Sequence, residues 1–354
     1  MYTSFHIQNF RGFEDFKIED LARINLFAGK NNVGKTALLE ALYLHGRAYN
    51  PQEALNLNQV RGLEFVMASD PSLIFRMRDT SRNILIEARD QKSGHRSIVL
   101  RIVQEADELA QISLRIRANG HSNGLSSLSE NIQVLALDYK VQGREEGTAY
   151  LVRTSPKEVS LSGVLTPPIK MVFIPAQGRP TSTELAKRFS NLEITNQHQV
   201  LLEMLTIIEP QIKRISVLYR DEQAALWGEV NRTLLPLNLL GDGLNRLVNL
   251  VTAIIENRDG IVLIDELENG LHHSVLTDVW KAIATAAREF NVQIFATTHS
   301  LEMIRAAHEA FKDEDPYDFR LHRLDRDEKT GKITAVTYDE DILEAAVEAN
   351  FEVR

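Results

Sequence analysis

The sequence predicts an α/β fold with a mixed, mostly parallel core sheet, an inserted antiparallel β-rich lobe and a helical lobe. The runs "GIVLIDE" and "VQIFATTHS" are apolar, end in polar residues and alternate with helical patterns. That texture is typical of strands buried on both faces of a parallel sheet. "RINLFAG" and "KMVFIPA" read as further strands of the same kind, and "KTALLEALYLHGRAY" has the apolar spacing of an amphipathic helix.

The order of these patterns predicts four parts. "SFHIQNFRGFEDFKI" reads as a strand, a turn and a strand, and "SLIFRMRD", "NILIEARD", "SIVLRIVQEA" and "QISLRIRANG" alternate like antiparallel strands. Residues 184–230 read as mostly helical, with Pro210 breaking or kinking a helix. A terminal hairpin and a closing helix follow. The expected parts are a first part of the core (1–48), a β-rich lobe (49–169), a core strand with a helical lobe (170–235) and the rest of the core (236–354).

Composition limits the function classes. The chain of 354 residues is 44% hydrophobic and 25% charged, which is ordinary for a globular protein. Its net charge of −9 argues against a globally basic DNA-coating protein but leaves room for a local basic stripe. The absence of cysteine excludes disulfides, thiol catalysis and cysteine-based metal sites. No apolar run approaches the roughly 20 residues that cross a bilayer, and no secretory signal is evident, so we expect a cytoplasmic protein without a membrane partner.

The segment "GKNNVGKT" matches the phosphate-loop pattern G-x-x-x-x-G-K-[ST], with a predicted strand before it and a helix after it. Glycines let backbone N–H groups surround phosphate, and the helix N-terminus adds positive potential. Lys35 would reach the β- and γ-phosphates of ATP, and the Thr36 hydroxyl would bind Mg²⁺. The alternative is a glycine-rich turn that binds nothing. The residues expected to contact nucleotide here are Gly29, Lys30, Asn31, Asn32, Val33, Gly34, Lys35, Thr36 and Ala37.

An acidic pair, Asp265 and Glu266, ends the apolar run "IVLIDE". Ligands of open α/β sheets bind beyond the carboxyl ends of the strands, so the pair is expected beside the phosphate-loop strand. Asp265 would hold Mg²⁺, and Glu266 would orient or deprotonate the attacking water. The alternative is a strand that ends in solvated acids.

Histidines follow both apolar runs. His299 comes directly after "VQIFATT", where it could reach the γ-phosphate or the attacking water; a structural or merely exposed histidine is the alternative. His272 and His273, in "ENGLHHSV", follow the acidic pair and could help build a dimer contact. A metal site there lacks an evident third ligand.

Together these residues resemble the ABC-type ATPases, in particular the branch with recombination and chromosome-maintenance ATPases and the overcoming-lysogenisation-defect nucleases. The resemblance is carried by "FHIQNFRGFEDFKIEDLARINLFAGKNNVGKTALLEAL", "LIDELENGLHH", "ATTHS" and "NFEVR", and covers residues 1–48 and 170–354. It implies an ABC-type ATPase head with a dimer-contact loop from Glu268 to His272 and a switch histidine at His299. It also makes Gln177, in "FIPAQGR", a metal-sensing glutamine and places Arg11, in "NFRGF", near the nucleotide.

The family has a signature loop at a helix start just upstream of the acidic strand, and "LGDGLNRL" occupies that place, about 20 residues before Asp265. By resemblance Gly241, Asp242 and Gly243 would contact the ATP of a second subunit. Gly241 stands where serine is common, and Asp242 where a small residue is common. An acid beside phosphate is repulsive unless it turns away or caps the helix, and simple capping by Asp242 is the alternative.

The resemblance implies a head that binds ATP and Mg²⁺, oligomerises with further copies of itself around ATP and hydrolyses it. Because the chain ends soon after the last ATPase element, the nuclease domain that follows the ATPase in the overcoming-lysogenisation-defect nucleases is expected to be missing. The leading hypothesis is therefore an ATPase that regulates a separately encoded effector, such as a nuclease or toxin, in anti-phage defence. The alternatives are a repair or recombination ATPase that binds DNA through segments such as "RIVQ" and "SLRIRANG", and a weakly hydrolysing ATP-dependent scaffold.

Overall fold

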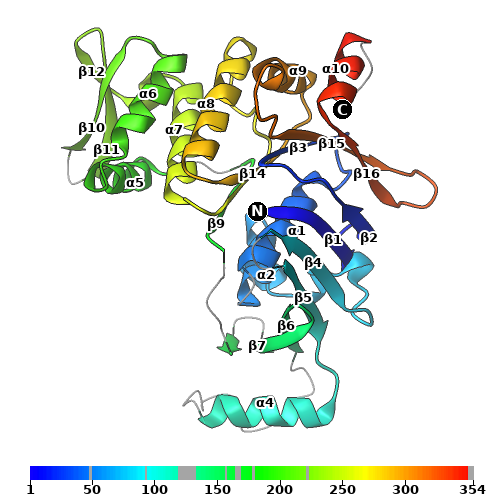
Figure 1. Cartoon of the computed structure of the whole chain (residues 1–354). Coiled ribbons are helices and arrows are strands. Elements are labelled where there is room, and N and C mark those ends of the chain that lie inside the picture. Colours follow the sequence, from blue (N-terminus) through cyan, green and yellow to red (C-terminus); the bar gives the residue numbers. More distant parts are fainter. Residues whose placement is uncertain are drawn as a thin grey trace. The chain divides into compact units, whose positions relative to one another are not determined.

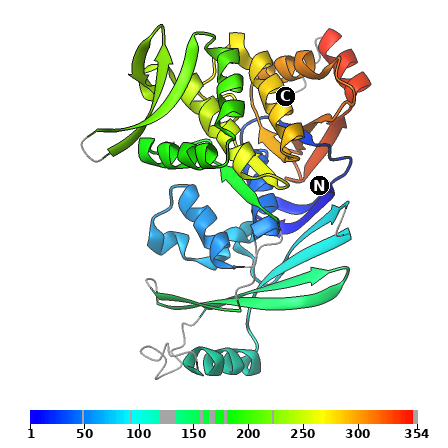
Figure 2. The ribbon, with the colours of Figure 1, turned by 60° about the vertical axis from the view of Figure 1, so that its left-hand side comes forward.

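A computed structural model describes the chain except for residues 48–49, 92–93, 119–132, 156–157, 164–168, 178–179, 221–222 and 350–354. The "NFEVR" ending thus lies outside the described residues. The chain forms two compact units (Figures 1 and 2). Unit 1 contains Met1–Leu21, Asn31–Lys170 and Leu324–Val336, and unit 2 contains Ala22–Lys30, Met171–Arg323 and Thr337–Arg354.

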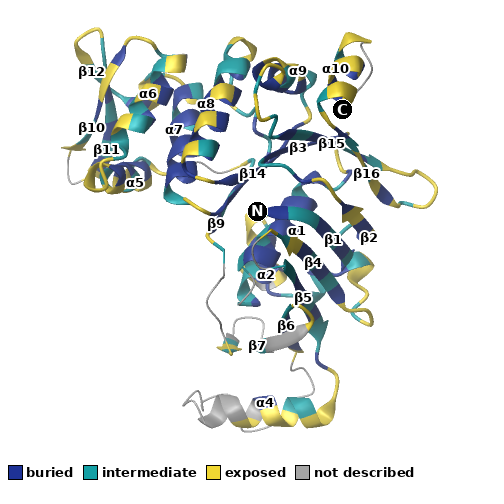
Figure 3. Cartoon of the chain, in the orientation of Figure 1, coloured by how far each residue is buried: buried dark blue, intermediate teal, exposed yellow. Residues whose placement is uncertain are grey.

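A six-stranded sheet with the order β16-β15-β3-β14-β13-β9 contains the core strands of unit 2, whereas the end of β15 and most of β16 are assigned to unit 1. Its strands are β16 (Ile333–Tyr338), β15 (Phe319–Arg326), β3 (Ile24–Ala28), β14 (Gln293–Thr297), β13 (Ile261–Ile264) and β9 (Met171–Ile174). The strands from β15 to β9 run parallel. Every residue of β3, β13 and β14 is buried (Figure 3), which confirms the expected α/β fold with a mixed, mostly parallel core sheet.

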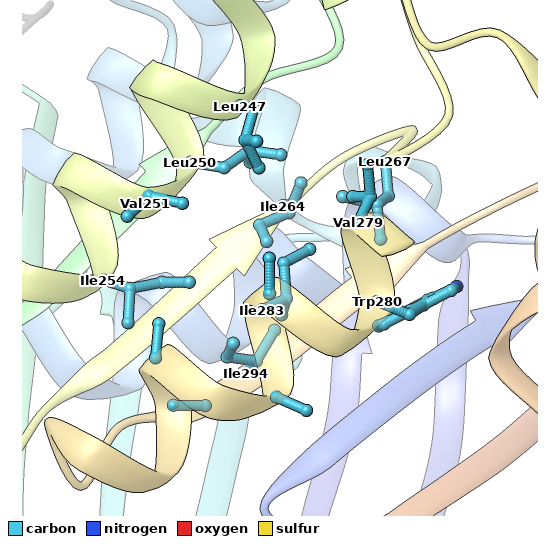
Figure 4. Close-up of a cluster of buried hydrophobic side chains, with 14 of the residues drawn as sticks. Leu247, Leu250, Val251, Ile254, Ile264, Leu267, Val279, Trp280, Ile283 and Ile294 are labelled. Carbon is cyan, nitrogen blue, oxygen red and sulfur yellow. The ribbon is translucent and has the colours of Figure 1, made fainter. Parts of the chain in front are cut away.

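The helices of unit 2 bury apolar faces in one hydrophobic cluster that also contains residues of this sheet. They are α5 (Ser182–Ile194), α6 (His198–Ile208), α7 (Asp242–Glu256), α8 (Leu276–Glu289), α9 (Leu301–Phe311) and α10 (Glu340–Glu348), with short 3-10 turns η3 (Leu237–Leu239) and η4 (His273–Val275). Figure 4 shows Leu247, Leu250 and Ile254 of α7 among the side chains that pack with Ile264 and Ile283. Because these α7 residues recur at three- and four-residue spacing, they form one buried face.

The stretch 184–230, expected to be mostly helical, is helical only as far as Ile208. Beyond Pro210 it forms a three-stranded antiparallel sheet of β10 (Ile212–Arg220), β11 (Gln223–Val230) and β12 (Thr233–Pro236). The expectation was wrong because "IKRISVLYR" and "QAALWGEV" carry β-branched and aromatic residues, with alternating burial in β11. Both α5 and α6 pack on this sheet.

Unit 1 contains a seven-stranded antiparallel sheet with the order β2-β1-β4-β5-β6-β7-β8. The strands are β1 (Tyr2–Phe10), β2 (Phe13–Ile18), β4 (Ile84–Asp90), β5 (Gly94–Ile102), β6 (Gln133–Val141), β7 (Arg144–Ser155) and β8 (Glu158–Ser162). The N-terminal strands therefore belong to the same sheet as the expected β-rich lobe. The helices of this unit are α1 (Lys35–Arg47), α2 (Gln52–Val60), α3 (Phe65–Ala68) and α4 (Ala106–Ala118).

Two segments expected as strands in this unit are helical. "SLIFRMRD" forms the 3-10 turns η1 (Pro71–Ile74) and η2 (Arg76–Arg78), and most of "QISLRIRANG" lies in α4. In α4, Leu109 and Ile112 stand three residues apart and pack against Val134 and Val152 of the sheet. The prediction of a strand from apolar and polar alternation was therefore wrong, because the i,i+3 spacing of these apolar residues forms a helical face. In the part of the chain that the structure describes, no helix is both long and apolar enough to cross a membrane.

Candidate nucleotide site

The phosphate loop has the expected strand–loop–helix setting. Strand β3 ends at Ala28, and α1 begins at Lys35. Between them Gly29, Asn32 and Gly34 have positive φ angles of 143°, 65° and 106°. A Cβ at Gly34 would lie 3.1 Å from Phe13 Cζ and 3.2 Å from the Ile333 side chain, in a conformation that side chains rarely adopt. Only glycine fits this turn, which brings successive backbone N–H groups to the start of a helix.

Side chains around the loop lie in unit 1. Lys35 is buried and Thr36 half-buried in the first turn of α1. Arg326, at the end of β15, donates from Nη1 to the Asn32 carbonyl over 3.5 Å. Arg326 was not predicted from the sequence, because it belongs to no recognised motif. It is far from the phosphate loop in the sequence and lies beside it only in the folded chain.

The acidic pair follows β13 in unit 2 and is tied to the neighbouring strand by Thr297. The Thr297 hydroxyl donates to Asp265 Oδ1 over 2.6 Å and accepts the Glu266 N–H over 2.8 Å. Asp265 is 5% exposed, and Glu266 has a φ of 47°. The Thr297 hydroxyl therefore fixes both the Asp265 carboxylate and the strained backbone of Glu266 at the same edge of the sheet.

Two further residues hold Glu266. Asn269 Nδ2 donates to Glu266 Oε2 over 2.8 Å. Arg246 of α7 donates from Nη2 to the carbonyl oxygens of Asp265 and Glu266 over 3.2 and 3.3 Å. The acidic pair is thereby connected to the helix that begins at the expected signature loop. Thr297 and Arg246 were not singled out from the sequence, although Thr297 stands two residues before the expected switch histidine. Asn269 lies in the expected dimer-contact loop, where no bond to Glu266 was expected.

His299 follows β14 and is anchored by Glu268. Glu268 Oε1 accepts the His299 main-chain N–H over 2.8 Å and lies 3.1 Å from His299 Nδ1. The Thr298 N–H donates to the Phe27 carbonyl of β3 over 2.9 Å. Because β3, β14 and β13 are adjacent and parallel, the start of the phosphate loop, His299 and the acidic pair follow the carboxyl ends of neighbouring strands.

The expected signature loop begins α7. Gly241 is the N-cap with a φ of 113°, without a side-chain capping bond, and Asp242 is the first helical residue. Asp242 is therefore not the N-cap residue, and it lies in the first turn, where a helix favours negative charge. The φ of Gly241 lies in a region that favours glycine over other residues. A Cβ at Gly243 would lie 3.3 Å from the Gly270 carbonyl, so this loop packs against the loop after the acidic pair.

Gln177 lines a cavity of about 760 Å³ in unit 2, and Asp242 and Asn269 line the same cavity. The expected metal-sensing glutamine thus shares this cavity with Asp242, the first residue of α7. The "GR" that ends "FIPAQGR" lies outside the described residues. The cavity is lined by Ala176, Gln177, Pro180, Thr181, Ser182, Leu185, Asn238, Asp242, Asn245, Arg246, Asn249, Asn269 and Gly270.

Arg11, expected near the nucleotide, is an internal ion-pair partner in unit 1. Its Nε donates to Glu40 Oε2 over 3.2 Å and its Nη1 to the Leu73 carbonyl over 3.1 Å. Burial lowers the pKa of the Arg11 guanidinium. Glu40, on α1, is completely buried and also accepts from Arg61 Nε over 2.6 Å. Arg11 thus holds the helix that carries Lys35.

His272 and His273 lie at the 3-10 turn after the acidic loop. His272 caps it by accepting from the Ser274 N–H, and the two rings lie 4.1 Å apart. Both side chains are exposed. These contacts are local to the turn.

Two family models and a relative of known description match this chain. A family model described as "AAA ATPase domain" matches residues 1–146, and one described as "AAA domain, putative AbiEii toxin, Type IV TA system" matches residues 183–305. An "ATP/GTP phosphatase" of Helicobacter pylori is 24% identical over 93% of this chain and 94% of its own length.

Solved structures similar to this chain include Smc head domains. An Smc head bound to the C-terminal winged-helix domain of ScpA is 13% identical with a TM-score of 0.49, over 98% of this chain and 99% of its own. The SMC head domain from Thermotoga maritima is 13% identical with a TM-score of 0.41, over 96% and 99%. The two family matches include the phosphate loop and the acidic pair, respectively. Two stretches of the chain thus match models of AAA-family P-loop ATPase domains, and these matches together with the phosphatase relative show that the chain is an ATPase.

Proposed function

We propose that this ATPase binds ATP with Mg²⁺, associates with further copies of itself around ATP, and couples hydrolysis to a separately encoded effector such as a nuclease or toxin. The observation that carries the proposal is the fixed acidic pair: Thr297 binds both Asp265 and Glu266, and Asn269 holds the Glu266 carboxylate. Such preorganisation is what a water-activating carboxylate requires. Within the P-loop ATPases we place the chain in the recombination and overcoming-lysogenisation-defect branch, on the sequence resemblance.

The residues proposed to hold nucleotide and metal have suitable chemistry. The loop from Gly29 to Ala37 and Lys35 would bind the phosphates. The Thr36 hydroxyl and the Asp265 carboxylate are hard oxygen donors of the kind that Mg²⁺ accepts together with phosphate oxygens, and Gln177 would sense the metal. Bound Mg²⁺ would neutralise charge on the β- and γ-phosphates. Asp265 already has a fixed orientation through its 2.6 Å bond from Thr297.

Glu266 is the proposed general base and His299 the proposed partner of the γ-phosphate or the attacking water. Asn269 occupies one oxygen of the Glu266 carboxylate and limits its rotation. Replacing a general base typically lowers the rate about 10²–10⁴-fold. We therefore expect Glu266→Gln to slow ATP hydrolysis by that order while ATP binding persists.

Self-association is proposed through the signature loop. Gly241 and Gly243 place the N-terminus of a 15-residue helix, α7, next to the Gly270 loop, and a helix N-terminus binds phosphate. Arg246 then connects that helix to the backbone of the acidic pair. ATP held by a partner copy and bound at this loop would thus be connected, through Arg246, to the Glu266 of the chain that carries the loop.

The test compares Glu266→Gln with wild type and with Glu289→Gln, a control on the exposed face of α8. Steady-state ATP and GTP turnover and gel filtration with and without ATP are measured for each. The proposal expects slow hydrolysis and an ATP-dependent larger species for Glu266→Gln alone. Equal turnover in all three proteins would support the weakly hydrolysing scaffold, and an unchanged monomer with ATP would overturn self-association.

The effector is proposed from two sources. One is the sequence resemblance, and the other is the toxin–antitoxin description of the family model that matches residues 183–305. Co-purification with the products of neighbouring genes tests it. A nuclease or toxin retained in an ATP-dependent manner supports the proposal, and retention of none contradicts it.

Direct DNA binding is the weaker alternative. Arg101, in "RIVQ", is bound by Glu108 over 2.7 Å and Asp138 over 2.9 Å, so its charge is compensated within the chain. Basic and acidic residues are equal in number in unit 1, and the whole acidic excess belongs to unit 2. A DNA-binding assay at two salt concentrations tests this alternative. An affinity for DNA that falls steeply as the salt concentration rises would support it.

A further inference from the structure

We propose that Glu268 is a positioning residue that holds His299 in one orientation and one tautomer, with the proton on Nδ1 and Nε2 as the free acceptor. The catalytic importance of this pairing rests on the proposed function, in which His299 serves ATP hydrolysis. The sequence resemblance placed Glu268 in a dimer-contact loop. In the structure its carboxylate lies 3.1 Å from Nδ1 of His299 in the same chain.

The contact fixes the histidine at two points. Glu268 Oε1 accepts the His299 main-chain N–H over 2.8 Å and lies 3.1 Å from Nδ1 of the ring. One oxygen thereby determines both where residue 299 leaves β14 and how its imidazole is rotated. The Glu268 side chain is 12% exposed, whereas that of His299 is 47% exposed. The buried partner is therefore the carboxylate, and the ring extends from it toward solvent.

The pairing also selects a tautomer. An ionised carboxylate accepts hydrogen bonds and donates none, so the ring nitrogen facing it must carry the proton. The bond made by one ring nitrogen sets the state of the other. With the proton on Nδ1, 3.1 Å from Glu268 Oε1, neutral His299 would present the Nε2 lone pair, which can accept a hydrogen bond from water. A second proton on Nε2 would turn the same ring into a donor for a phosphate oxygen.

The loop that carries Glu268 is anchored on both sides. The N–H of Leu267, a fully buried residue, donates to the Thr297 carbonyl over 3.0 Å, and the Leu271 N–H donates to the Glu268 carbonyl over 3.0 Å. The second carboxylate oxygen, Oε2, is buried without a hydrogen-bond partner among the described residues. Buried polar atoms are normally satisfied. Among the described residues the other oxygen, Oε1, contacts His299, which fits a residue that positions the ring.

The experiment uses the full chain labelled with ¹⁵N-histidine and compares wild type, Glu268→Ala and Glu268→Gln. Glutamine keeps an acceptor oxygen but removes the charge. The nitrogen shifts of His299, assigned by loss of its signals in His299→Asn, report the tautomer. We expect Nδ1-protonated imidazole in wild type and Glu268→Gln, and loss of that preference in Glu268→Ala. Glu309→Gln, at an exposed pair with Lys312 on α9, is the control and should leave these shifts unchanged.

Steady-state kinetics on the same proteins give the second readout. Loss of a residue that orients a metal-bound histidine through a hydrogen bond typically costs about 10–100-fold, and we take the same order for His299. We expect kcat to fall by that order in Glu268→Ala with KM nearly unchanged, and to recover largely in Glu268→Gln. An unchanged His299 tautomer in both Glu268 variants would overturn the proposal, whatever the activity. If the tautomer changes but His299→Asn hydrolyses ATP at the wild-type rate, the role of His299 in the proposed function fails while the pairing stands.

Discussion

Asn269 Nδ2 donates to Glu266 Oε2 over 2.8 Å and to the Ala176 carbonyl over 3.3 Å. A single amide thus connects the proposed general base to the segment that follows β9 and leads to Gln177. Glu266 also has a positive φ, which is unfavourable for a residue with a side chain. Thr297 holds its backbone N–H, and Asn269 holds its carboxylate. A change in the position of Ala176 would therefore change the orientation of the Glu266 carboxylate through Asn269.

Replacement of Asn269 by alanine should lower kcat about tenfold and leave the KM for ATP nearly unchanged. The carboxylate keeps its charge but loses the bond that orients it, and positioning effects of this kind are typically worth about 10–100-fold. Steady-state ATPase kinetics measure both constants. Asn56→Ala is the matched control, because Asn56 also donates to a glutamate three residues earlier, Glu53, over 3.2 Å. Equal kcat for the two variants would contradict the positioning role of Asn269.

Glu40→Gln should destabilise the protein by about 3 kcal/mol, because breaking a buried ion pair leaves the partner charge uncompensated. Glu40 is fully buried and serves both Arg11 and Arg61, and burial already disfavours the charge on Arg11. Urea denaturation followed by circular dichroism measures the loss. Glu19→Gln, at an exposed pair with Lys17, should leave the midpoint nearly unchanged. A similar midpoint for both variants would mean that the Glu40 cluster contributes little.

Arg326→Ala should raise the KM for ATP about fivefold, equivalent to about 1 kcal/mol, with little change in kcat. Its guanidinium lies at the phosphate loop, 3.5 Å from the Asn32 carbonyl, and arginine suits phosphate geometry. Nucleotide titration and steady-state kinetics measure the effect. Lys329→Ala, on the exposed turn after β15, is the control. A KM unchanged in Arg326→Ala would place Arg326 outside the nucleotide site.

The sequence predicted those parts of the site that local chemistry determines. A phosphate loop needs glycines and a lysine at fixed spacing, so Gly34 and Lys35 could be read directly. Thr297, Asn269 and Arg246 could not, because their role arises only where strand ends and α7 meet. The same reason explains the errors in the fold. Short amphipathic runs such as that of α4 fit both a strand and a helix until a packing partner, here Val134 and Val152, selects one.

Stability should fall as the pH is lowered from 6.5, because two buried histidines resist protonation in the folded chain. Burial lowers the pKa of His45 and of His322 from 6.5 to about 3. Between these values the unfolded chain binds a proton that the folded chain excludes, so each histidine costs about 1 kcal/mol by pH 5.5. The midpoints of urea unfolding at pH 7.5 and pH 5.5 test this. Both pH values lie above the range in which ordinary carboxylates titrate. His322→Asn should show a smaller difference between the two midpoints, and a difference equal to that of wild type would refute the assignment.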